Sequence, residues 1–186
     1  MAALVANYPA AGAAVTAGDA RRVVLDWPED VDELVALVES AYRGESSRAG
    51  WTTEADLLDG QRTDADEVQS MLPHLLVAQT DDGIIGCCAL VPEARHGQFG
   101  MFAVRPGRQA SGLGSALLRE AEARARGLGL DLVEMTVLSL RTELIAFYER
   151  RGYRRTGERR PFPHHDERFG LPRRGDLEFE VLAKDL

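Results

Sequence analysis

Two glycines that stand one residue apart, Gly112 and Gly114 in the stretch RQASGLGSALL, are the first residues of this chain to suggest a chemistry. They precede a segment, residues 114–127, whose pattern predicts a helix. The first turn of a helix presents backbone N–H groups that have no partner inside the helix, at the positive end of the helix dipole. Glycine lets an anion approach that backbone closely. With Ser115 and the charge of Arg108, the loop could therefore bind phosphate groups.

Other interpretations of the same loop remain open. In the G-x-G-x-x-G loop of an NAD-dependent oxidoreductase, Gly112 and Gly114 would be the first two glycines, and Glu134 would be the acid that binds a ribose. However, Leu117 replaces the third glycine, and seven residues, 105–111, separate the loop from the preceding strand. A P-loop fails because no Gly-Lys-Ser/Thr follows. Two glycines before a helix can also form a plain tight turn.

Two longer stretches carry a family resemblance. MFAVRPGRQASGLGSALL contains Gln109-Ala110-Ser111-Gly112-Leu113-Gly114, which resembles the Arg/Gln-x-x-Gly-x-Gly/Ala signature of the acetyl-CoA loop in the GNAT N-acetyltransferase superfamily. About forty residues later, ELIAFYERRGY is similar to the family's second motif, in which a helix carries a tyrosine and ends at a glycine-aromatic pair. Tyr148 and Gly152-Tyr153 occupy those positions. The pair of motifs, in this order, predicts the family.

The resemblance implies a binding site for acetyl-CoA, with CoA as the product. Backbone amides of the loop would hold the pyrophosphate, and the preceding strand would pair with the pantetheine arm. The family often has an asparagine near residues 139–142 that bonds this arm; here there is none, and Ser139 or Arg141 could replace it. The predicted cofactor-binding residues are therefore Phe102, Ala103, Val104, Arg108, Gln109, Ala110, Ser111, Gly112, Leu113, Gly114, Ser115 and Arg141.

Acyl transfer to an amine also needs groups that move protons. An alkyl amine has a pKa of about 10.4 and must lose a proton before it attacks, and a departing thiolate leaves more readily when an acid protonates it. The resemblance makes Tyr148 the candidate acid; otherwise it is a core tyrosine beside Phe147. Glu134 is the candidate base, because a carboxylate among apolar neighbours has a raised pKa and can relay through water. The alternative for Glu134 is a residue that faces solvent.

The chain departs from the family at the usual position of the base. Many members have a glutamate on the strand before the glycine loop, whereas GQFGMFAV contains no carboxylate. His96, Glu54 and a chain of water molecules therefore stay open as other routes for the proton.

Two polar loops are expected to form the part of the site that binds the amine acceptor. Trp51 and Glu54 could hold a cationic amine through the ring face and the charge, although packing and helix capping are the alternatives. His164 and His165 lack the spacing of helical zinc ligands, so no metal is expected. The expected partner is a small-molecule or peptide amine.

These residues together predict an N-acetyltransferase that moves acetyl from acetyl-CoA to a primary amine by direct attack in a ternary complex. Cys87 and Cys88 have no histidine motif beside them and are not expected to act as nucleophiles. A non-catalytic acyl-CoA sensor on the same fold is the alternative, and the NAD-binding oxidoreductase is the third hypothesis.

The elements that must position these residues follow from hydrophobic periodicity and turn residues. A strand at 21–25 precedes a helix at 28–42, and capping-box spacings predict short helices after Thr53 and Thr63. The remaining elements are a hairpin over 75–92, strands at 98–104 and 130–138, helices at 114–127 and 141–151, and strands near 153 and 176–182. This order predicts an α/β protein with a GNAT-like mixed sheet, mostly antiparallel and twisted, with one parallel splayed pair and helices on both faces.

Length and composition limit the number of domains and the kinds of partner that the protein can have. The 186 residues suit one domain, expected over 21–186 after a flexible tail at 1–20. A net charge of -8 disfavours nucleic acid, and no apolar run is long enough for a membrane span. Cys87 and Cys88 are adjacent and cannot form an ordinary disulfide, which suits a reducing cytoplasm. Exposed strands in this fold often pair, so a homodimer is one expected assembly.

Overall fold

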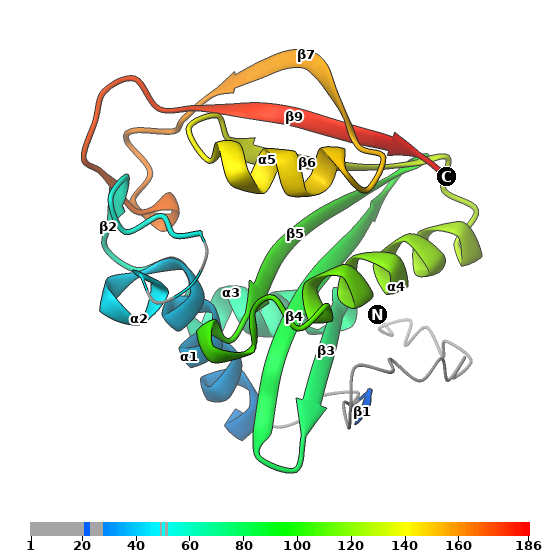
Figure 1. The fold of residues 1–186 in the computed structure, drawn as a ribbon, viewed down its shortest axis with the longest axis horizontal. Coiled ribbons are helices and arrows are strands. Elements are labelled where there is room, and N and C mark those ends of the chain that lie inside the picture. The colour runs from blue at the N-terminus through cyan, green and yellow to red at the C-terminus, as the bar shows by residue number, and fades with distance from the viewer. Residues whose placement is uncertain (1–20, 23–27, 49, 51) are drawn as a thin grey trace, which may run out of the picture.

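The computed structural model describes residues 21–22, 28–48, 50 and 52–186, and most of them belong to one sheet with helices on its two faces (Figure 1). The predicted tail at 1–20 lies outside the described residues, as do residues 23–27 of the first predicted strand and its connection.

The main sheet confirms the predicted mixed topology. Its neighbouring strands are antiparallel except for β5 and β6, which run parallel. In spatial order the described strands are β1 (Arg21–Arg22), β3 (Leu75–Thr80), β4 (Gly83–Glu93), β5 (His96–Val104), β6 (Leu132–Leu138), β9 (Glu178–Asp185) and β7 (Arg154–Pro161).

Helices cover both faces of this sheet. On one face, α4 (Leu113–Gly127) and α5 (Thr142–Glu149) share a core with the strands, and on the other α1 (Pro28–Tyr42) and α3 (Ala65–Met71) do so. β4 is buried on both sides along most of its length for this reason. The short helix α2 (Gly44–Arg48) follows α1. None of the helices in the described ranges is both long and apolar enough to cross a membrane.

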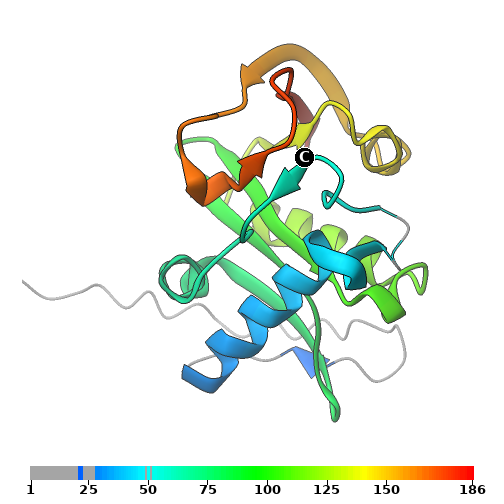
Figure 2. The same ribbon diagram turned by 90° about the vertical axis from the view of Figure 1, so that its left-hand side faces the viewer.

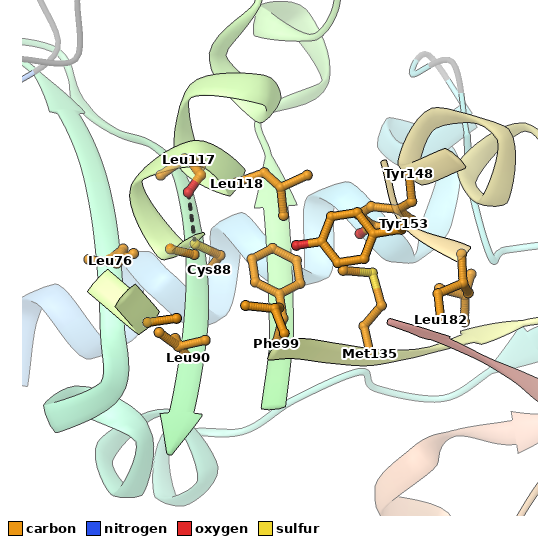
Figure 3. Close-up of a cluster of buried hydrophobic side chains, with 14 of the residues drawn as sticks. Leu76, Cys88, Leu90, Phe99, Leu117, Leu118, Met135, Tyr148, Tyr153 and Leu182 are labelled. Carbon is orange, nitrogen blue, oxygen red and sulfur yellow. Dashed lines mark hydrogen bonds between the residues drawn. The ribbon is translucent and has the colours of Figure 1, made fainter. Parts of the chain in front are cut away.

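Figure 3 shows part of the core beneath α4 and α5. Within it the Cys88 thiol donates a weak hydrogen bond to the Leu117 carbonyl oxygen, 3.9 Å away. Burial raises the pKa of Cys87 to about 12, and it raises the pKa of Cys88 well above the ordinary value. Both thiols are buried and protonated, so they behave as small apolar core residues.

Two short strands form a second sheet. β2 (Leu58–Asp59) pairs antiparallel with β8 (Leu171–Pro172), so two loops that are far apart in the sequence lie side by side (Figure 2). Leu58 packs there with Leu138, Phe162 and Leu177. The helix predicted after Thr53 is wrong: residues 54–57 form a turn, because the chain must reverse into β2.

Most predicted boundaries agree with the structure to within a few residues. The helix predicted after Thr63 is confirmed as α3, but its N-cap is Asp64, whose carboxylate accepts from the Glu67 N–H at 2.8 Å. Thr63 donates its hydroxyl to the Glu67 carboxylate instead. The helix predicted at 141–151 is α5, which ends two residues early, at Glu149.

The parallel pair diverges after three residue pairs. β5 and β6 pair from His96 with Leu132 to Gln98 with Glu134, and then separate. Further along β5 the register with β4 shifts by one residue, and Met101 has a φ of 43°. Such a β-bulge increases local twist and bends the strand, which directs the end of β5 away from β6. The opening between them is where both cavities described below lie.

The start of α4 depends on a left-handed residue. Gly112 is the N-cap with φ 88°, and a Cβ built there would meet no atom within 4 Å. We expect Gly112→Ala to lower the free energy of unfolding by about 1–2 kcal/mol, because only the backbone conformation is penalised. Gly127→Ala, in the last turn of the same helix and also in open space, is the matched control and should not destabilise. Urea denaturation measures both; equal midpoints would contradict the expectation.

Candidate active site

The glycine loop forms one wall of a cavity of about 300 Å³, here called the donor cavity. It lies between the end of β5, the loop before α4, and α5. Eight of the predicted cofactor-binding residues line it, namely Phe102, Val104, Gln109, Ala110, Gly112, Gly114, Ser115 and Arg141. The structure thus brings the separated motifs to one place.

The other predicted cofactor-binding residues do not line the donor cavity. Leu113 and Ala103 are buried in the cores on opposite faces of the sheet. Arg108 contributes its carbonyl oxygen to the Ser111 hydroxyl at 2.7 Å, so these two residues shape the loop.

The loop conformation is held by specific contacts. Ala110 has φ 62°, which places a second left-handed residue just before Gly112. The Gln109 side chain donates to the Val104 carbonyl oxygen at 3.2 Å, which joins the loop to β5. Gly114 approaches β5 closely, since a Cβ there would lie 3.1 Å from Cζ of Phe102. An alanine at position 114 would require the Phe102 ring to move by a few tenths of an ångström.

A second cavity of about 190 Å³, here called the acceptor cavity, adjoins the first. Its wall includes β5 and β6 beyond their last pair, the 54–62 segment and the 162–169 segment. Both cavities are lined by Tyr42, Phe102, Arg141 and Leu144, so these residues mark the border between them.

Tyr148 lines the acceptor cavity, although its ring is almost wholly buried among Phe99, Phe147 and Tyr153. Burial raises the pKa of Tyr148 well above its ordinary value, the nearby Tyr42 phenol adds to this, and the charge of Arg141 opposes it only in part. The phenol therefore keeps its proton at neutral pH, as a general acid must.

Tyr42 was expected only as the last residue of a helix. Its hydroxyl donates to the Phe102 carbonyl oxygen at 2.8 Å, which ties the end of α1 to the bulged part of β5. The guanidinium groups of Arg62 and Arg141 lie over its ring, 5.2 Å and 5.4 Å from the centroid. Nothing in the sequence marks this contact, because position 42 also suits the apolar face of the helix.

Glu54 lies on the acceptor cavity, but both its oxygens already accept from arginines. Oε1 accepts from Arg141 at 2.6 Å and Oε2 accepts from Arg43 at 2.7 Å, and all three side chains are at least 91% buried. Burial raises the pKa of Glu54, but the charges of Arg141 and Arg43 outweigh it, and the pKa falls below the ordinary value. In this arrangement Glu54 positions two arginines. Trp51, its predicted companion, lies outside the described residues.

Glu134 lines neither cavity. It stands on β6 opposite Gln98, and its Oε1 accepts from Arg160 on β7 at 2.9 Å. Thr136, two residues further along β6, does line the acceptor cavity. As a base, Glu134 would therefore have to act through water, and this role stays a prediction.

The six arginines of residues 150–160 divide between the site and the surface. Arg151 contacts the Ser115 hydroxyl and stacks on Phe147, 3.5 Å from the ring centroid, and with Arg150 it lines the donor cavity. The others form ion pairs with acidic residues of the described chain or face solvent. In the described part of the chain no group of three or more His, Cys, Asp or Glu is arranged to hold a metal.

Comparisons with known proteins agree with this fold. Residues 72–155 match the acetyltransferase (GNAT) domain family. An amino-acid acetyltransferase of Azotobacter vinelandii is 35% identical over 86 residues, which cover 45% of this chain and 19% of that protein. The chain therefore spans about a fifth of that relative.

Solved structures share the fold at low sequence identity. The Escherichia coli ribosomal-protein-S18-alanine N-acetyltransferase superposes with a TM-score of 0.64 at 14% identity, over 89% of this chain and 93% of that one. N-acetylglutamate synthase of Neisseria gonorrhoeae, solved with coenzyme A and N-acetyl-glutamate, gives 0.61 at 19% identity, over 90% of this chain and 35% of that one. Residues 72–155, which hold the glycine loop and Tyr148, thus match the GNAT acetyltransferase domain family that the two motifs predicted.

The Glu54 contacts predict a stability that depends on pH. Glu54→Gln leaves Arg43 and Arg141 buried without their counter-charge, and we expect the free energy of unfolding at pH 7 to fall by about 3 kcal/mol. The pKa of Glu54 is lowered by folding, so its contribution is present above the ordinary value of 4.5 and is lost as the pH falls through the lower folded value. The difference between wild type and variant should therefore narrow in acid.

Asp59→Asn is the control for this experiment, because Asp59 pairs with Arg173 on the surface. Its removal should change stability little at any pH. A Glu54→Gln variant as stable as Asp59→Asn at pH 7 would show that the buried cluster does not support the fold.

Proposed function

We propose that this chain transfers the acetyl group of acetyl-CoA to a primary amine by direct attack in a ternary complex. The observation that carries the proposal is the meeting of two cavities at Tyr42, Phe102, Arg141 and Leu144, one lined by the glycine loop and the other by Tyr148. Donor and acceptor bound on either side of this border would touch. No covalent nucleophile is then needed, and both cysteine thiols are buried and protonated.

The donor cavity fits a ligand that carries phosphate groups. Gly112, the N-cap of α4, provides no side-chain cap, so the first backbone N–H groups of the helix would be available to a bound phosphate. Arg150 and Arg151 bring positive charge to the same wall. The Phe102 and Val104 carbonyl oxygens already accept from Tyr42 and Gln109, so pairing with the pantetheine arm would rely on the other groups of β5.

The chemistry divides between the bound donor and the chain. Acetyl-CoA, when bound, supplies the acetyl group as a thioester. The neutral amine nitrogen forms a bond to the acetyl carbon while the carbon–sulfur bond breaks. Tyr148 gives its proton to the departing sulfur and recovers one from the new amide nitrogen through water. From a protonated amine, the transfer yields the amide, the CoA thiol and one proton.

Acetyl-CoA binding is the first test of this proposal. We expect calorimetric titration to give binding of acetyl-CoA and CoA in the micromolar range, and none of NAD. NAD binding without acetyl-CoA binding would favour the oxidoreductase hypothesis. The structure already disfavours it, because β5 also pairs antiparallel with β4, and its parallel pairing with β6 ends after three residue pairs, unlike the parallel strands of a dinucleotide-binding unit.

Tyr148→Phe tests the general acid. We expect kcat to fall by about a hundredfold, with little change in the dissociation constant of acetyl-CoA, because only the phenol proton is removed. Tyr153→Phe is the control, since that ring packs against Tyr148 at 5.8 Å but lines neither cavity. Stopped turnover in both variants would point to packing rather than proton transfer.

A non-catalytic acyl-CoA sensor is the second candidate. One observation favours it: among the described residues that line the acceptor cavity, the only carboxylate is Glu54, and both its oxygens are occupied. Tight acetyl-CoA binding with no acetylation across a broad set of amines would support this candidate.

A further inference from the structure

The side chains that line the acceptor cavity carry more positive charge than negative charge. Among its described lining residues the charged side chains are Arg62, Arg141 and Glu54. Glu54 is shared between Arg141 and Arg43, so its charge is fully used. Nε of Arg141 is buried and has no hydrogen-bond partner. A buried N–H donor without a partner is costly, and together with the unmatched charge of Arg62 it points to an anionic ligand at this place.

Arg62 is the side chain that could meet such a ligand. Within the described chain its guanidinium forms no hydrogen bond or ion pair, and it lies over the Tyr42 ring. Two carboxylates lie near Arg62 but do not line the cavity. Glu39 accepts from the backbone N–H groups of residues 62 and 63, and Glu67 accepts from the Thr63 hydroxyl. Both carboxylates therefore already accept hydrogen bonds from the 62–63 segment.

The remaining wall is largely apolar. It includes Leu58, Met71, Val91, Val137, Phe162 and Phe179. A ligand that fills about 190 Å³ there would need a small apolar body in addition to its anion. Guanidinium groups bind carboxylates with paired hydrogen bonds, which gives both affinity and orientation.

We propose that the acceptor is an apolar α-amino acid whose carboxylate is bound by Arg62 and Arg141. This inference rests on the proposed function. Tyr42, which both guanidinium groups contact, stands at the border of the two cavities. In an α-amino acid the amine and the carboxylate share one carbon, so a carboxylate held beside Tyr42 places the amine at that border. Glu54 is then a positioning residue for Arg141 and does not bind the amine.

Matched acceptors test the inference. Acetyl-CoA-dependent thiol release is measured with L-leucine, L-methionine and L-phenylalanine, and with the three amines that lack only the carboxylate. We expect Arg62→Gln to raise KM for the amino acids by about ten- to a hundredfold, the loss expected for one charge-assisted pair. KM for the carboxylate-free amines should not change. Comparing variant with wild type cancels the different basicities of the two kinds of amine.

Controls separate this effect from misfolding. Arg62→Lys should recover part of the lost affinity, and Arg95→Gln, at an exposed ion pair, should behave as wild type. Each variant is also titrated with acetyl-CoA, whose dissociation constant should stay constant. A second readout needs no turnover: in the presence of CoA, N-acetyl-L-phenylalanine should bind, and its amide should bind at least tenfold more weakly.

The outcomes distinguish the two proposals. Equal use of amino acids and carboxylate-free amines, or equal binding of the acid and its amide, overturns the carboxylate site and leaves acetyl transfer intact. The same holds if Arg62→Gln changes none of these values. If the wild-type protein fails to bind acetyl-CoA, the proposed function falls, and the inference falls with it.

Discussion

The separation of β5 from β6 is the constraint on which the site depends. These two parallel strands pair over only three positions, which leaves a wedge-shaped opening in the middle of the sheet. The backbone N–H and C=O groups along the opening must find hydrogen-bond partners other than a neighbouring strand. Aromatic rings fill the α4 and α5 side: Phe99, Phe102 and Tyr148 have centroids 5.3 to 6.4 Å apart. Rings are too stiff and bulky for the strands to close over them. The same packing that keeps the sheet open therefore places Tyr148 on the acceptor cavity.

A single buried carboxylate links the segments around this opening. Glu54 binds Arg43, which follows α1, and Arg141, which directly precedes α5. Its own segment leads into β2, which pairs with β8 from the far end of the chain. At Glu54 the end of α1 and the start of α5 are thus joined with little exposure to water, where charge-assisted hydrogen bonds are strong and unpaired partners are costly. The start of α5, and with it the place of Tyr148 two turns later, is fixed by that contact.

The sequence predicted the local elements well, but it did not predict the ion pairs between residues that are far apart in the chain. The elements that hold the two motifs have strong periodicity, and the glycine loop, α4 and α5 lie where their patterns predict. Tyr148 was recognised because its position relative to Gly152 is local. Glu54 and Arg141 were both singled out, but separately, because a contact across 87 residues leaves no spacing signal. Arg62 and Tyr42 were missed for the same reason, and the two-residue strands β2 and β8 are too short for any period to show.

The positive charge of the acceptor cavity affects how the amine can lose its proton without a carboxylate base on β5. β5 offers no carboxylate, and Glu134 is engaged by Arg160 outside the cavity. Nearby positive charge and burial both lower the pKa of an amine, because each disfavours the ammonium form. If the acceptor's carboxylate is bound by Arg62, the amine lies at the border beside Arg141, whose Nε is buried without a partner. An ammonium is least stable in that position and loses its proton to water more readily. The arginines that select the acceptor would then also supply much of the activation that a dedicated carboxylate provides elsewhere.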